Sequence, residues 1–102
     1  MAKFVYVFTG AQPATTPEEQ EQSMQAWGAW FATLGESVTD AGNPFGTSVT
    51  VSSSSVTDRG ASGAGGYSIV EAESLHDAAA KAKGCPVLQG GGSVEVYEAL
   101  AM

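Results

Sequence analysis

The segment Lys3–Thr9 most constrains the fold, because both of its faces are apolar. It is rich in β-branched and aromatic residues, which is typical of a β-strand. Side chains of a strand alternate between the two sides of a sheet. One side therefore carries Phe4, Tyr6 and Phe8, and the other carries Val5 and Val7. Helices on one side alone would leave one of these faces in water, so the strand predicts a cover on both sides.

The next segment carries the pattern of an amphipathic helix. Thr16 can cap the helix, Pro17 suits its first position, and Glu19 completes a capping box. Apolar side chains then recur at spacings of three and four, which predicts a buried stripe. This stripe consists of Met24, Trp27, Phe31 and Leu34, with Trp30 widening it. Gly35 predicts the end of the helix.

The rest of the chain predicts further strands and a second helix. The expected segments are a short extended piece at 37–40, a turn at 41–46, a longer strand at 47–56, a Gly- and Ser-rich hairpin connection at 57–66, a strand at 67–71, a helix opened by 74–77 and a last strand at 93–98. The narrow apolar face of the second helix consists of Leu75, Ala78, Ala79 and Ala82. Gly84 ends this helix.

The order of these elements, β-α-β-β-α-β, predicts an α+β fold of the ferredoxin-like type with a four-stranded antiparallel sheet. A chain of 102 residues suits a single domain spanning 1–102. Such a monomer hides only roughly 60–65% of the surface that its unfolded chain exposes. Since the sheet face opposite the helices would be bare, we expect a homodimer in which a second sheet covers it.

The charge balance limits the kinds of partner. Eleven Asp and Glu against four Lys and Arg give a net charge of −7, and the basic residues form no stripe. These basic residues are Lys3, Arg59, Lys81 and Lys83. Nucleic acids and anionic membranes are bound through clustered Lys and Arg, so neither is an expected partner. The first apolar run is too short for a signal peptide or a membrane span, which predicts a cytoplasmic protein.

The reactive side chains of the sequence do not form a recognisable catalytic or metal-binding set. Cys85 is the single cysteine, which excludes an internal disulfide and predicts a small buried side chain. His76 is the single histidine, and its place in the first turn of a helix predicts exposure to solvent. A role as general base would need an orienting carboxylate such as Asp77 or Asp40. One His and one Cys leave scattered carboxylates as the remaining metal ligands, and the glycine groups lack the pattern of a phosphate-binding loop, so we expect neither a metal nor a cofactor.

Aromatic and polar residues supply the candidates for a ligand pocket. If the first strand, the third strand and the first helix converge, some of these side chains would line the space between sheet and helix. The pocket candidates are Tyr6, Trp27, Asp40, Asn43 and Tyr67. For Trp30 and Phe31, the helical spacing favours a place in the core.

Several segments together resemble the YCII-related family. They are the aromatic first strand, Trp27–Phe31, the turn Ala41–Pro44, Gly65–Tyr67, Glu73–Leu75 and Gly92–Val96. The resemblance implies a dimeric α+β barrel with small-molecule pockets between sheet and helix. Some family members are similar to lyases that act on chlorinated or hydroxylated aromatics and carry a His–Asp pair. The position of that His on the first helix is occupied here by Met24 or Gln25.

Two functions of different classes follow as hypotheses. The first is a YCII-like protein that binds or transforms a small, aromatic or planar metabolite in a pocket of each subunit. The second is a non-catalytic dimerisation or accessory module whose pocket is vestigial. Heme or monooxygenase-type chemistry on the same barrel ranks last, because the sequence offers no candidate for an axial ligand better than His76.

Overall fold

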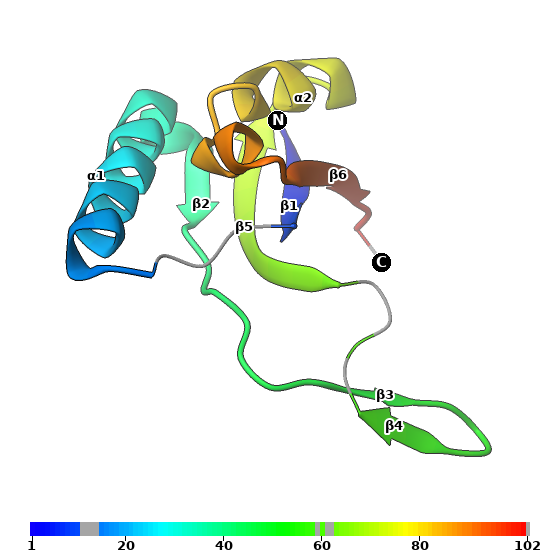
Figure 1. The fold of residues 1–102 in the computed structure, drawn as a ribbon. Coiled ribbons are helices and arrows are strands. Elements are labelled where there is room, and N and C mark those ends of the chain that lie inside the picture. The colour runs from blue at the N-terminus through cyan, green and yellow to red at the C-terminus, as the bar shows by residue number, and fades with distance from the viewer. Residues whose placement is uncertain (11–14, 59, 61–62, 102) are drawn as a thin grey trace.

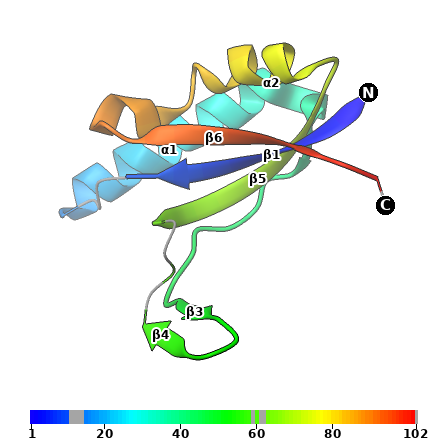
Figure 2. The same cartoon turned by 90° about the vertical axis from the view of Figure 1, so that its right-hand side faces the viewer.

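The computed structural model describes residues 1–10, 15–58, 60 and 63–101, and within them an antiparallel sheet carries two α-helices (Figure 1). The sheet consists of β1 (Ala2–Thr9), β2 (Val38–Asp40), β5 (Ala64–Ala72) and β6 (Ser93–Ala99), in the order β2-β5-β1-β6. The helices are α1 (Pro17–Leu34) and α2 (Leu75–Ala82), with 3-10 turns at η1 (Gly35–Ser37) and η2 (Pro86–Gly90). Both helices lie on the same side of the sheet (Figure 2). The α+β class is therefore confirmed.

Local hydrogen bonds explain why α1 begins and ends where the sequence predicts. The Thr16 hydroxyl accepts from the backbone N–H of Glu19 at 3.1 Å, and Pro17 occupies the first turn. Gly35 follows the last turn with a φ of 57°, and its N–H donates to the Phe31 carbonyl. One detail of the cap differs, because the Glu19 carboxylate accepts from Thr15.

The buried face of α1 is rotated away from the predicted stripe. Trp30 and Leu34 are buried and Trp27 is partly buried, whereas Met24 is 75% exposed. With about 100° per residue, Met24 lies roughly 100° around the helix from the line joining Trp30 and Leu34. The prediction that Met24 belongs to the buried stripe is therefore wrong. Of the apolar face predicted for α2, Ala78 and Ala82 are buried, whereas Leu75 and Ala79 are exposed.

The strand expected at 47–56 does not form. Residues 49–51 form β3 (Val49–Val51) and residue 56 begins β4 (Val56–Asp58), and these two strands make a separate hairpin that stands away from the larger sheet (Figure 1). Ser52 closes the hairpin, because its N–H donates to the Ser55 carbonyl at 2.8 Å and its hydroxyl accepts from the Ser55 N–H at 3.1 Å. The second strand of the larger sheet is thus the short piece β2.

The strand β1 is apolar on both faces, and only one of these faces is covered. Phe4, Tyr6 and Phe8 are buried against the helices. On the opposite face Val5 pairs with Ile69 and Val7 with Tyr67, and all four remain partly exposed. We call this set Val5, Val7, Tyr67 and Ile69 the open face. Both helices lie on the other side of the sheet, and the chain that leads to the β3–β4 hairpin leaves the sheet on this side (Figure 2), where Phe45 stacks on the Tyr67 ring.

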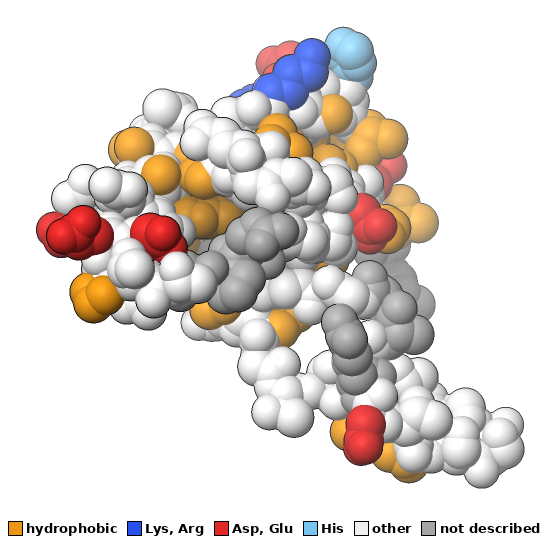
Figure 3. Space-filling model, in the orientation of Figure 1, with side chains coloured by type: hydrophobic (Ala, Val, Ile, Leu, Met, Phe, Trp, Pro, Cys, Tyr) orange, Lys and Arg blue, Asp and Glu red, His pale blue; other side chains and the backbone are white. Residues whose placement is uncertain are grey.

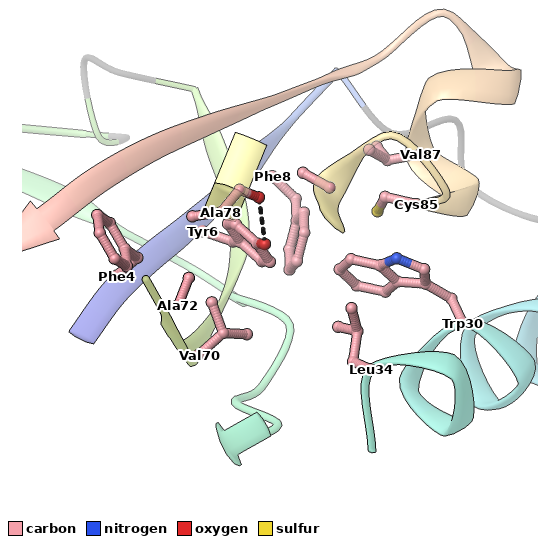
Figure 4. Close-up of a cluster of buried hydrophobic side chains, with 11 residues drawn as sticks. Phe4, Tyr6, Phe8, Trp30, Leu34, Val70, Ala72, Ala78, Cys85 and Val87 are labelled. Atoms are coloured by element: carbon pink, nitrogen blue, oxygen red, sulfur yellow. Dashed lines mark hydrogen bonds between the residues drawn. The ribbon is translucent and has the colours of Figure 1, made fainter. Parts of the chain in front are cut away.

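Two hydrogen bonds connect the layers of the core, and Figure 4 draws the first of them as a dashed line. The Tyr6 hydroxyl donates to the Ala78 carbonyl at 2.6 Å and so ties β1 to α2. The Trp30 indole N–H donates to the Lys81 carbonyl at 3.2 Å and so ties α1 to α2. Cys85 is buried beside this network, as predicted. Among the described residues, no helix is long and apolar enough to cross a membrane.

The Tyr6 hydroxyl makes the protein sensitive to alkali. Burial, and secondarily the Asp77 carboxylate, raises the Tyr6 pKa from 10.0 to about 12. The neutral phenol therefore contributes stability that is fully present below pH 10 and is lost as the pH rises towards 12. We expect Tyr6→Phe to cost about 1–2 kcal/mol at pH 8, since it removes a buried hydrogen bond.

Urea unfolding at pH 8 and pH 11 tests this expectation. The wild type should lose more stability between the two pH values than Tyr6→Phe does. Burial also raises the pKa of the Cys85 thiol to about 11, but this group is present in both proteins and cancels in the comparison. An equal loss in the two proteins would show that Tyr6 is not the group that titrates.

Candidate functional site

The five predicted pocket residues lie in two separate places. Tyr6 and Trp27 are on the side of the sheet that faces the helices. Asp40, Asn43 and Tyr67 gather where β2 leaves the sheet and beside the start of β5. The structure therefore does not bring the five side chains together in one pocket.

Tyr6 occupies the position of a core residue. Its side chain is 0% exposed, and its hydroxyl is engaged with the Ala78 carbonyl. Its ring lies 5.9 Å from the Trp30 ring, between centroids. A bound molecule would have to displace this packing to reach Tyr6.

Asp40, Asn43 and Tyr67 hold a turn against β5. The Asp40 carboxylate accepts from the Gly42 N–H at 2.8 Å and from the Tyr67 hydroxyl at 3.4 Å. The Asn43 carbonyl accepts from the Tyr67 N–H at 3.3 Å, and the Tyr67 ring stacks on Phe45 with centroids 5.8 Å apart. These contacts explain the conformation of the turn by local hydrogen bonding.

A groove of about 300 Å³ lies between α1 and η2, and Trp27 is the candidate that lines it. The other lining residues are Glu19, Gln22, Ser23 and Ala26 from α1, and Pro86, Val87, Gln89 and Gly90 from η2. The spacing of the α1 residues places them on one face over three turns of the helix. In Figure 3 hydrophobic side chains are visible in a hollow next to the acidic side chains of α1.

The Trp27 ring is held in place by its aromatic neighbours. It meets Phe8 edge to face with centroids 4.9 Å apart, and Trp30 edge to face at 5.8 Å. Phe31 lies 6.1 Å away on the following turn. Such ring pairs favour defined orientations, so Trp27 presents a preformed surface to the groove.

The polar side chains of the groove can form hydrogen bonds but supply little for catalysis. Gln22 and Gln89 each offer an amide donor and acceptor from opposite walls. Hydrogen bonds from Thr15 lower the pKa of the Glu19 carboxyl and so favour its ionised form. Among the described lining residues Glu19 is the one ionisable side chain. The groove therefore combines an aromatic wall with hydrogen-bonding amides and one carboxylate.

The reactive side chains outside the groove do not form a second site. His76 is exposed on the first turn of α2, as predicted. Cys85 is buried, and burial raises its thiol pKa to about 11, which disfavours the nucleophilic thiolate. Asp77 forms an ion pair with Lys81 at 2.8 Å. In the described part of the chain, no three His, Cys, Asp or Glu side chains are grouped to hold a metal ion.

Trp27 is the pocket candidate that lines the groove, whereas the polar residues around it were not singled out from the sequence. Glu19, Gln22 and Ser23 precede Trp27 at helical spacings of eight, five and four residues, so Glu19 and Ser23 could have been assigned to its face of the helix. Gln89 carries no such signal, because it lies in a segment that the sequence marks only as the approach to a glycine turn.

A comparison with protein-family models and with curated proteins found no match to this chain.

Proposed function

We propose that the protein binds a small planar molecule in the groove between α1 and η2. The observation that carries this proposal is the partly buried Trp27, fixed by three aromatic neighbours at a groove of about 300 Å³. Ligand sites of proteins range from about 300 to 1,000 Å³ and combine apolar walls with a few polar groups. A volume at the lower limit fits a molecule of one or two rings.

We further propose that the chain is a ferredoxin-like subunit of a dimeric α+β barrel of the YCII-related type. The strand order β2-β5-β1-β6, with both helices on one side, supports the subunit fold. The open face supports the dimer, because covering apolar side chains at the centre of a sheet removes them from water and stabilises the assembly. A second copy offers the same apolar surface and would form a two-fold contact.

The composition of the groove favours binding over catalysis. The described lining residues include neither an imidazole nor a thiol, and Glu19 is their one ionisable side chain. This observation also supports the second candidate function, an accessory module that has kept the fold without a reaction. The two candidates differ in whether the groove binds a ligand.

Native mass spectrometry with a panel of one- and two-ring compounds tests both parts of the proposal. We expect a dimer that takes up one compound per subunit. Trp27→Leu should weaken this binding at least about tenfold, since it removes the aromatic surface. Met24→Leu is the matched control, because Met24 is 75% exposed on the same helix and does not line the groove.

The outcomes separate the two parts. A monomeric species that binds compounds would contradict the dimeric barrel and leave the groove intact. A dimer that binds none of the panel would contradict the binding function and favour the accessory module. Equal binding by Trp27→Leu and the wild type would place the site elsewhere.

A further inference from the structure

The two ends of the groove differ in chemistry. Glu19 and Trp27 line it from the first and third turns of α1. Eight residues of helix separate them, which corresponds to about 12 Å along the helix axis. One end thus carries a carboxylate and the other an aromatic ring, with the amides of Gln22 and Gln89 also lining the groove.

The negative charge at Glu19 is fixed in position. Its Oε2 accepts from the Thr15 N–H and the Thr15 hydroxyl, both at 2.9 Å. These bonds lower the pKa of the carboxyl and hold it at the start of the helix. A carboxylate can accept about four hydrogen bonds, so Glu19 retains capacity for a ligand.

No cation of the described chain balances this charge within the groove. The described lysines are Lys3 on β1 and Lys81 and Lys83 on and after α2, and none of them lines the groove. The protein as a whole carries a net charge of −7. An anionic ligand would therefore meet repulsion both from Glu19 and from the whole molecule.

We infer that the groove selects an aromatic amine, with the ring on Trp27 and the protonated amine towards Glu19, and discriminates against aromatic carboxylates. This inference rests on the proposed binding function and adds the charge of the ligand to it. The ring is recognised by aromatic contact, and the ammonium by the electrostatic attraction of the Glu19 carboxylate across the groove.

Three probes that share one ring test the inference on the full chain. They are tryptamine, indole-3-acetamide and indole-3-acetate, which carry a positive, neutral and negative side arm. Affinities are measured by protein-observed NMR titration at pH 7 and low salt, following the Trp27 indole and the Gln22 and Gln89 amides. We expect tryptamine to bind about threefold more tightly than the amide, since the Glu19 carboxylate attracts the ammonium through solvent, and the carboxylate to bind most weakly.

Glu19→Gln should abolish the preference for tryptamine over the amide. Glutamine is accepted at this position of a capped helix, so the variant is expected to keep α1. Glu21→Gln is the matched control, because it removes the same charge from the same helix and does not line the groove. It should retain the preference.

The possible failures are distinguishable. Equal affinities for the three probes, or tightest binding of the carboxylate, would overturn the charge inference and leave the proposed binding function standing. An equal loss of preference in Glu19→Gln and Glu21→Gln would also overturn it, since the effect would then come from the overall charge. If none of the probes shifts the groove signals, the proposed binding function itself is wrong and the inference falls with it.

Discussion

Replacing Trp30 with alanine is expected to lower the free energy of unfolding by about 3–5 kcal/mol. Trp30 is 4% exposed and its ring touches Tyr6, Phe8 and Phe31 at centroid distances of 5.9, 6.1 and 5.1 Å. The variant would leave a cavity where α1 meets the sheet, and the Lys81 carbonyl would lose its indole donor. Chemical denaturation measures the loss.

Single domains are stable by only about 5–15 kcal/mol, so a loss of this size could unfold Trp30→Ala altogether. Two further variants keep the prediction testable in that case. Trp30→Phe retains an aromatic ring and loses the hydrogen bond, so it should cost clearly less than the alanine variant. Met24→Ala, on the exposed side of α1, should change stability by less than about 0.5 kcal/mol. Similar losses for Trp30→Ala and Met24→Ala would show that α1 does not pack through Trp30.

Replacing Gly42 with alanine is the second change with a large expected effect. Gly42 has a φ of +75°, and a Cβ atom there would lie 1.7 Å from the Tyr67 carbonyl oxygen. The new methyl group cannot be accommodated unless the turn moves away from β5, which would break the hydrogen bond from the Tyr67 N–H to Asn43. We expect a loss of roughly 2–4 kcal/mol, from backbone strain and displacement together.

Gly91→Ala separates the two causes. Gly91 has a φ of +86°, but nothing lies within 4 Å of a Cβ atom built there. This control shares the left-handed conformation without the collision, and it should cost only about 1 kcal/mol. If thermal or urea unfolding shows equal losses for both variants, the close approach of residue 42 to β5 is not present in solution.

The features that the sequence predicted well depend on neighbouring residues. Thr16 and Ser74 cap their helices through hydrogen bonds to residues three positions later, and Gly35 ends α1 by its conformation. These interactions are complete within one turn of chain, so the identities of adjacent residues were enough to predict them. The apolar alternation of β1 was readable for the same reason.

The features that the sequence did not predict depend on distant residues. The sequence predicted a short extended piece at 37–40 and a longer strand at 47–56, and pairing with β5 made the shorter piece the strand of the larger sheet. Trp27 and Gln89 form one groove although 62 positions separate them in the chain. Local sequence patterns carry no information about this proximity of Trp27 and Gln89, because it results from how α1 and η2 pack on the same sheet.

The sequence by itself thus determined the helices, the two-sided first strand, the buried Cys85 and the acidic character of the protein. These follow from propensity, periodicity and charge, which act along the chain. Only the tertiary structure decided that Tyr6 is enclosed in the core, that Asp40 and Tyr67 support a turn, and that Glu19 shares a groove with Trp27. Burial and proximity in space are properties of the packed chain, and packing is settled by contacts between residues far apart in sequence.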